Sequence, residues 1–442
     1  MSFKIREYIE PSGQRNAVIV DTKTGLPEFW PALYVSSKLR ASGFALSTKV
    51  AQLNAILCFY HWVEIRGVEL ESRIASGQGF SRNEIDALVS LLRSRISDLP
   101  QLNPRSSNIL DIGSAKAKSS DIWKALEEQP RQIGASSYND RLVYVGNYVE
   151  WLCDYLSDQD PHSSQQKRET IQNSGIKLKA ALKSMKSVEP NTTFDAPRDI
   201  MNKDVRTIIE RIKPFNPLNP WQEPSTQIRN YALILVLLDT GLRSGELLSL
   251  KPGDIIFGKK KAKGIKVRRR QGSKDDPRKR QPSTKRDERE VPLSDGAFKA
   301  LDLYVTEVRN RIPKASQTSY LFVSVGNSNV GQPLGSISSI TDKIREETGI
   351  DLTPHKLRHA ATWRYCVAQK KQGRKWDEFV DQLCLKFGWS NPESPSVRHY
   401  AKRYRKEEMF EAAINEQDQM SAEIEEAVET VKLEEGKIND SR

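Results

Sequence analysis

Three short stretches of this 442-residue chain contain side chains that can do chemistry on a phosphate. The first contains Arg243, the second contains His355 and Arg358, and the third ends at Tyr400. Two guanidinium groups can hold a phosphate through paired hydrogen bonds, an imidazole can move a proton, and a phenol can act as a nucleophile. Together these groups could attack a phosphodiester without a metal ion.

Arginine suits the clamping role because its planar fork remains charged at any working pH. Arg243 follows a glycine that can end a helix. Glu246 stands three residues later, at the start of the next predicted helix, where a carboxylate is favourable. We therefore expect Glu246 to pair with Arg243 and orient it.

His355 and His359 are four residues apart, so they share one face of a helix. This spacing can bind zinc in a His-Glu-x-x-His motif, but Lys356 replaces the glutamate and no third ligand is near. Arg358 is also close to His355 on a helix, and both can point into one cleft. We expect no metal ion, with His355 at the phosphate and His359 in a structural role.

The sequences around these residues resemble three motifs of the tyrosine recombinase (phage-integrase) family. TGLRSGEL resembles the family's first arginine box, HKLRHAAT its His-x-x-Arg-His box, and FGWSNPESPSVRHYAK its final box. The resemblance spans roughly the last half of the chain before its tail. It implies that Trp389 donates its indole N–H to a phosphate oxygen and that Tyr400 is the nucleophile. Because the spacing from Trp389 to Tyr400 is longer than is usual in the family, Tyr404 is the competing tyrosine.

The resemblance also implies a catalytic lysine between the two arginine boxes, on a turn before a Val-Pro-Leu strand. Lys285 fits this position in TKRDEREVPL, with Lys266 and Lys274 nearby as alternatives. It would protonate the leaving 5′-oxygen. The implied reaction forms a 3′-phosphotyrosine link, which stores the energy of the broken bond, so neither a cofactor, a metal ion nor ATP is needed. Consistently, the sequence has no G-x-x-x-x-G-K-[ST] loop and no convincing set of carboxylates for two-metal catalysis.

The elements that must position these groups are predicted to be mostly helical. Strands are expected only in short segments, among them two within residues 3–21 and one on each side of a charged stretch near residue 275. We predict a mainly α fold with a small antiparallel sheet, in which the resemblance implies a helical core-binding domain and an α+β catalytic domain. The predicted parts are residues 1–35 as a short β-hairpin or arm region, 36–186 as the DNA-binding core-binding domain, 187–204 as a linker, 205–410 as the catalytic domain, and 411–442 as an acidic tail that either frays or forms a helix docking on a neighbouring protomer.

Charge points to a nucleic-acid partner. The net charge is +12, but residues 411–442 carry ten acidic and three basic residues, so the first 410 residues carry +19. Lys259 to Arg286 holds fourteen Lys or Arg in twenty-eight positions, and we expect its middle to be a mobile loop that contacts the DNA backbone. The predicted DNA-binding residues are Lys259, Lys260, Lys261, Lys263, Lys266, Arg268, Arg269, Arg270, Lys274, Arg278, Lys279 and Arg280.

Other features limit the location and the partners. The four cysteines form no C-x-x-C pair and lie mostly among apolar residues, which favours core positions and a reducing compartment. The N-terminus has no apolar signal region, and the longest apolar run is too short to span a bilayer. We expect a cytoplasmic protein, associated with the nucleoid if it is bacterial. Its partners would be double-stranded DNA carrying specific sites, three further copies in a tetramer on that DNA, and accessory proteins of the same mobile element.

Three functions are compatible with this set of residues. The first is a site-specific DNA recombinase or integrase that serves integration, excision or transposition of a mobile element. The second is a type IB topoisomerase-like enzyme, which would use the same chemistry on one duplex. The third is a DNA-binding protein without catalysis, against which the complete set of candidate groups argues. The separate helical N-terminal region and the HKLRH box favour the first.

Overall fold

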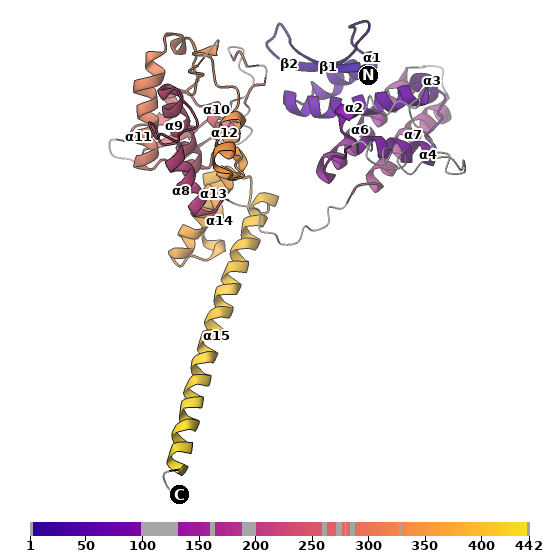
Figure 1. Ribbon diagram of the computed structural model, residues 1–442. Coiled ribbons are helices and arrows are strands. Elements are labelled where there is room, and N and C mark those ends of the chain that lie inside the picture. Colours follow the sequence, from indigo (N-terminus) through magenta and orange to yellow (C-terminus); the bar gives the residue numbers. More distant parts are fainter. Residues whose placement is uncertain are drawn as a thin grey trace, which may run out of the picture. The chain divides into compact units, whose positions relative to one another are not determined.

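The computed structural model describes residues 3–98, 131–159, 164–187, 200–258, 263–270, 276–278, 280–282, 288–326 and 329–439. The chain divides into two compact units, Met1–Asp195 and Ala196–Arg442 (Figure 1). The division lies within the stretch 187–204 that the sequence predicts to be a linker. The predicted fold class, mainly helical with small antiparallel sheets, is confirmed.

The first unit joins a β-hairpin to a group of helices (Figure 1). The hairpin strands pair antiparallel from Phe3 opposite Asp21 to Ile9 opposite Arg15. Its core contains the aromatic side chains of the long helices, and the hydroxyls of Tyr60 and Tyr148 share a 2.8 Å hydrogen bond there. These aromatics therefore pack the interior of the unit. The elements are β1 (Phe3–Ile9), β2 (Arg15–Asp21), α1 (Phe29–Tyr34), a π-helical turn (Val35–Leu39), α2 (Leu46–Arg66), α3 (Leu70–Ala75), α4 (Arg82–Leu92), α6 (Ala135–Asp158) and α7 (Gln165–Ser184).

The second unit is built around one buried helix, α9 (Pro224–Thr240). Its sequence is apolar on most sides, and such a helix is stable only when other elements cover it. Helices α11 (Asp295–Leu303) and α13 (Pro354–Lys371) pack against it. The left-handed backbone of Gly241, with φ of 65°, ends α9 as the sequence predicts.

A small sheet lies beside this core, with strand order β3-β4-β5 and antiparallel pairing throughout. Ile265 of β4 lies opposite Val291 of β5, and both side chains are buried in the core. The strands are β3 (Ile255–Ile256), β4 (Gly264–Val267) and β5 (Arg289–Pro292). The strands that flank the charged stretch are therefore present, and they hold its two ends together.

A second hydrophobic cluster joins α13, α14 and the start of α15. It contains Phe379 and Phe387 of α14 together with Tyr400 and Tyr404 of α15. The remaining elements of this unit are α8 (Asn202–Arg211), α10 (Ser244–Leu248), a 3-10 turn (Pro252–Asp254), a π-helical turn (Tyr304–Val308), two further 3-10 turns (Arg309–Arg311 and Pro313–Gln317), α12 (Ser338–Thr348), α14 (Trp376–Phe387) and α15 (Pro395–Asn439).

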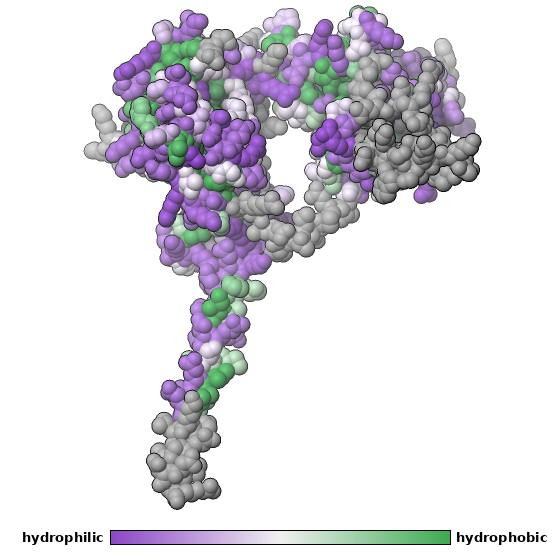
Figure 2. Space-filling view, viewed as in Figure 1, coloured by the Kyte–Doolittle hydropathy of each residue, from purple (hydrophilic) through white to green (hydrophobic). Residues whose placement is uncertain are grey.

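Helix α15 has 45 residues, and its first turns carry both candidate tyrosines. Further along, it exposes apolar side chains such as Phe410, Ile414 and Met420, which interrupt its hydrophilic surface in Figure 2. No helix among the described residues is both long and apolar enough to pass through a bilayer.

Candidate active site

One pocket of the second unit brings together five of the six residues predicted to be catalytic. Its volume is about 490 Å³. It is lined by Arg243, Ser244, Gly245, Pro354, His355, Arg358, His359, Trp389, Ser396 and Tyr400. Residues more than 150 positions apart in the sequence therefore line one cavity, which is the convergence that the motifs require.

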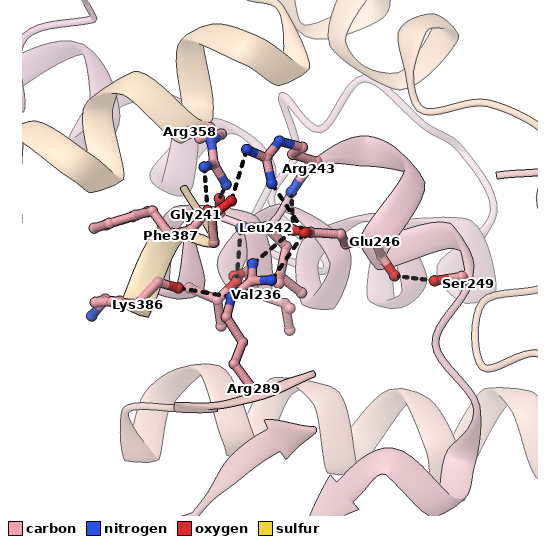
Figure 3. A network of polar contacts seen from close by, with 12 residues as sticks. Val236, Gly241, Leu242, Arg243, Glu246, Ser249, Arg289, Arg358, Lys386 and Phe387 are labelled. Atoms are coloured by element: carbon pink, nitrogen blue, oxygen red, sulfur yellow. Dashed lines mark hydrogen bonds and ion pairs between the residues drawn. The ribbon is translucent and has the colours of Figure 1, made fainter. Parts of the chain in front are cut away.

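Three arginines meet at the C-terminal end of α14. Arg289 donates to the carbonyl of Lys386 at 3.0 Å, Arg358 donates to the carbonyl of Phe387, and Arg243 donates to the carbonyl of Gly388 at 3.1 Å. Figure 3 shows the guanidiniums gathered at this helix end. The last carbonyls of a helix lack partners within the helix, and the negative end of its dipole favours cations. The end of α14 is therefore a natural holder for positive side chains.

Arg358 is the more deeply held of the two predicted clamp residues. Its side chain donates to the carbonyl of Gly241 at 2.6 Å and lies over the ring of Trp389, 5.0 Å from its centroid. Burial and the neighbouring guanidinium of Arg243 lower the pKa of Arg358 to about 9. The group is still protonated at neutral pH, and it lies in an excess of positive charge that a bound anion would relieve.

Arg243 precedes α10 and is oriented by Glu246, as the sequence predicts. Its backbone N–H donates to one carboxylate oxygen at 2.9 Å, and its guanidinium donates to the other at 3.2 Å. The Arg243 side chain remains 36% exposed, whereas that of Glu246 is 3% exposed. The buried Glu246 carboxylate thus holds the Arg243 guanidinium in place, while part of that guanidinium side chain stays accessible.

Sequence reasoning missed Arg289, which binds the same carboxylate. It donates to both oxygens of Glu246, at 3.0 and 2.9 Å (Figure 3). Burial raises the pKa of Glu246, but the hydrogen bonds and charges of Arg289 and Arg243 outweigh this and the net pKa is lowered. The only signal in the sequence was the position of Arg289 just before Val-Pro-Leu, which alone predicts a strand and not a partner.

The two histidines of α13 lie side by side, with ring centroids 4.2 Å apart and the rings nearly perpendicular. His355 is exposed at the pocket. Partial burial lowers its pKa, and the guanidiniums of Arg358 and Arg243 lower it further. The other histidine, His359, contacts the candidate nucleophile: its Nδ1 shares a hydrogen bond with the hydroxyl of Tyr400. The prediction that His359 is merely structural did not anticipate this contact.

The two candidate tyrosines point to different places. Tyr400 is 1% exposed, and it lines the pocket described above. The hydroxyl of Tyr404 donates to the carbonyl of Arg374 at 2.6 Å, and its ring packs against Trp376. Of the two, only Tyr400 lines the pocket with Arg243 and its partners.

Trp389 forms one wall of the pocket. It follows Gly388, which ends α14 in a left-handed conformation with φ of 62°. Its ring lies 5.5 Å from that of Phe387 and 5.6 Å from that of Tyr400. The loop after α14 thereby places Trp389 between the clamp residue Arg358 and the candidate nucleophile.

The carboxylates and histidines of the described residues do not form a metal site. No group of three or more His, Cys, Asp or Glu side chains comes together in that part of the chain. His355 and His359 are adjacent, but the neighbours described above are a tyrosine and two arginines.

Comparison with known proteins identifies the segment that carries this site. Residues 199–371, which contain Arg243, His355 and Arg358, match the Phage integrase family. This segment is therefore similar to the phage integrase family. Trp389 and Tyr400 lie beyond the matched residues, so their assignment rests on the pocket geometry and on the resemblance of the final motif.

Two curated proteins are similar to this chain. Tyrosine recombinase XerA of Pyrococcus furiosus is 28% identical over 174 residues, which cover 39% of this chain and 49% of XerA. TnP I resolvase of Bacillus thuringiensis is 23% identical over 252 residues, which cover 57% of this chain and 69% of the resolvase. The chain thus spans about half the length of the first relative and about two thirds of the second.

Solved structures of similar proteins have low sequence identity. XerH site-specific recombinase bound to difH substrate is 15% identical with a TM-score of 0.36, covering 79% of this chain and 93% of that chain. A lambda integrase (75–356) dimer bound to a COC′ core site is 14% identical with a TM-score of 0.43, covering 85% and 94%.

The charged stretch is partly anchored to the fold. Lys285, the candidate catalytic lysine, lies outside the described residues, as do Lys259, Lys260, Lys261, Lys274 and Lys279. Arg278 is buried: it pairs with Asp276 at 2.8 Å and donates to the carbonyls of Leu248 and Leu334 at 3.0 Å each. In this arrangement Arg278 stabilises the fold and does not face solvent.

The other described residues of this predicted DNA-binding set differ in their surroundings. Arg268 and Arg270 pair with the carboxylate of Asp254, at 3.1 and 2.6 Å. Lys263 pairs with Asp295 at 2.8 Å. The backbone of Arg269 belongs to the segment after β4, and its side chain is exposed, while Lys266 is half-buried and Arg280 is exposed.

Proposed function

We propose that this protein is a site-specific DNA recombinase that cuts and rejoins DNA strands through a 3′-phosphotyrosine intermediate. The observation that carries the proposal is that Tyr400 lines one pocket together with Arg243, His355 and Arg358. The match of residues 199–371 to the Phage integrase family supports it. The relatives named as a tyrosine recombinase and a resolvase point the same way.

In the proposed mechanism, a DNA phosphate binds between Arg243 and Arg358. Their forks hold its non-bridging oxygens, where charge develops in the transition state. His355 and the indole N–H of Trp389 donate hydrogen bonds to the same phosphate. Because the backbone carbonyls of α14 and Glu246 already hold both guanidiniums, little ordering is needed when DNA binds.

The phenol oxygen of Tyr400 then attacks the phosphorus, and the 5′-oxygen of the next nucleotide leaves. Lys285 is our candidate for the group that gives this oxygen a proton. The phosphotyrosine link keeps the energy of the broken bond, so that a 5′-hydroxyl of a partner strand can reverse the attack and join the DNA. No step requires a nucleotide or a metal ion.

The other parts of the chain would serve the same reaction. We assign residues 36–186 as a core-binding domain and the basic residues around β4 as DNA-backbone contacts. The solved structures named above are of complexes with recombination sites, in one case as a dimer, and a lambda integrase tetramer has been solved on a Holliday junction. We propose that this chain acts as a tetramer on DNA, in the compartment that contains the host DNA. In this tetramer, α15 would contact a neighbouring protomer.

The test uses a pool of nicked duplexes with randomised arms, on which cleavage releases a short fragment and traps the enzyme. Protein–DNA complexes that survive SDS are isolated and their DNA is sequenced. We expect the wild type to give adducts on a restricted set of sequences, and Tyr400→Phe to give none while still binding DNA. A Tyr400→Phe variant that forms adducts, with Tyr404→Phe unable to, would show that the nucleophile is misassigned.

A second assay separates the alternative functions. Plasmids that carry two copies of the selected sequence are incubated with the enzyme, and both recombination and relaxation are measured. Exchange between the two copies supports a recombinase, whereas relaxation without exchange supports a type IB topoisomerase-like enzyme. Binding without any adduct would leave only a DNA-binding protein.

A further inference from the structure

The hydroxyl of Tyr400 contacts His359. Its oxygen shares a hydrogen bond with Nδ1 of His359, and the two ring centroids lie 5.6 Å apart. His359 comes from the middle of α13, one position after Arg358, and it is half-buried beneath the start of α15. The candidate nucleophile thus has an imidazole in direct contact with its reacting oxygen.

His355 occupies the other side of the pocket. It touches His359 edge-on, and the groups that act on its pKa besides partial burial are Arg358 and Arg243, the two clamp residues. A neutral imidazole next to two guanidiniums is suited to donate a hydrogen bond to a phosphate oxygen. The two histidines, four residues apart on α13, therefore face different reaction partners.

We propose that His359 is the group that accepts the phenol proton when Tyr400 attacks. This inference rests on the proposed function and extends it. As the bond between the Tyr400 oxygen and phosphorus forms, the phenol proton moves to Nδ1 of His359. The bond from phosphorus to the 5′-oxygen breaks, and that oxygen takes its proton from the separate cationic acid assigned above. On rejoining, the His359 imidazolium returns its proton to the departing phenol oxygen.

The chemistry requires a base at this position. A phenol has an ordinary pKa of about 10, so at neutral pH it carries its proton and attacks weakly. A base within hydrogen-bond reach contributes about 100- to 10,000-fold to such a step. For Nδ1 to accept, His359 must carry its own proton on Nε2. His359 meets the geometric requirement because its Nδ1 shares a hydrogen bond with the phenol oxygen.

The first experiment compares rates of adduct formation on the trapped DNA for three variants. His359→Ala removes the base, and His359→Asn keeps an acceptor near the Nδ1 position but cannot take a proton. The matched control is His399→Ala, because His399 is exposed and its ring also lies 5.6 Å from that of Tyr400. We expect both His359 variants to be at least about 100-fold slower and His399→Ala to remain within about threefold of wild type.

The second experiment removes the need for the proton transfer. In a Tyr400→Phe background, DNA that ends in a 3′-(p-nitrophenyl) phosphate is joined to a 5′-hydroxyl strand, releasing p-nitrophenolate, which leaves without a proton. We expect the joining rate with His359→Ala or His359→Asn to remain within about threefold of the rate of the Tyr400→Phe parent. Adding Arg358→Ala to the same parent should abolish joining. A comparable loss in both assays would mean that His359 only maintains the fold of the pocket, and would overturn the proposal.

Three further outcomes are decisive. If His359→Asn cleaves as fast as wild type, His359 positions the phenol but does not take its proton, and the proposal is wrong. If wild-type protein forms no adduct, the proposed function fails and this proposal fails with it. By contrast, His359→Ala at the wild-type rate overturns this proposal alone.

Discussion

Replacing Arg289 by alanine tests how much the ion pair with the buried carboxylate of Glu246 contributes to the stability of the site. The side chain of Arg289 is 9% exposed and that of Glu246 is 3% exposed. The substitution removes two hydrogen bonds to Glu246, at 3.0 and 2.9 Å, and one to the carbonyl of Lys386, at 3.0 Å. Removing one partner of a buried ion pair costs about 3–5 kcal/mol, because the other charge is left in a dry environment.

Arg243 provides the matched comparison because it binds the same carboxylate from a more exposed position, with its side chain 36% exposed. Truncating it should cost only about 1 kcal/mol, as is usual for exposed pairs. In a unit of this size each kcal/mol shifts the unfolding midpoint by about 2–4 °C. We therefore expect Arg289→Ala to lower the midpoint by roughly 6–20 °C and Arg243→Ala by about 2–4 °C.

The assay is thermal unfolding of the full chain, with hydrogen exchange of the α9 and β5 amides to assign the transition to the second unit. Adduct formation is measured on the same samples, well below each midpoint. Arg243→Ala should lose adduct formation while remaining folded, whereas Arg289→Ala should lose stability first. Arg289→Lys keeps the charge but not the forked guanidinium, so its unfolding midpoint should lie between those of wild type and Arg289→Ala. Equal midpoints for Arg289→Ala and wild type would refute the reasoning.

Three further predictions concern single groups. Tyr404→Phe loses its hydrogen bond to the carbonyl of Arg374, so unfolding should show a loss of about 0.5–1.5 kcal/mol with unchanged adduct formation. Arg269→Ala should reduce the salt dependence of DNA binding by about one ion equivalent, whereas Arg278→Ala, which breaks a buried pair, should lower stability by about 3–5 kcal/mol; binding titrations and unfolding curves compare them. The lowered pKa of Glu246 means that its charge stabilises the folded state above the unfolded pKa of about 4.3, and that this contribution is lost as pH falls through the folded value. Glu246→Gln should therefore weaken the acid dependence of the unfolding free energy.

Sequence reasoning recovered the elements and motifs that depend on local signals. Gly241 predicted the end of α9, and short apolar segments predicted β4 and β5 on each side of the charged stretch. The order of Arg243, His355 and Tyr400 along the chain was enough to predict that they share a site, and all three line one pocket.

What escaped prediction depends on partners that no motif displays. Arg289 binds a carboxylate 43 positions earlier in the chain and a backbone carbonyl 97 positions later. Arg278 sits in a stretch whose composition indicates exposure, yet Asp276 and two carbonyls bury it. His359 was read from its spacing to His355, whereas its contact with Tyr400 depends on how α15 packs on α13. Such pairings are set by tertiary packing, which spacing alone does not specify.

The arginine holder at the end of α14 has a consequence for how this sequence can vary. Its three acceptors are main-chain oxygens, at positions 386, 387 and 388, so none of the three hydrogen bonds depends on a particular acceptor side chain. Adding or deleting one residue within the helix would instead rotate these oxygens by about 100° and disengage all three forks together. Relatives that retain the site should therefore tolerate amino-acid substitutions along this helix better than an insertion or a deletion within it.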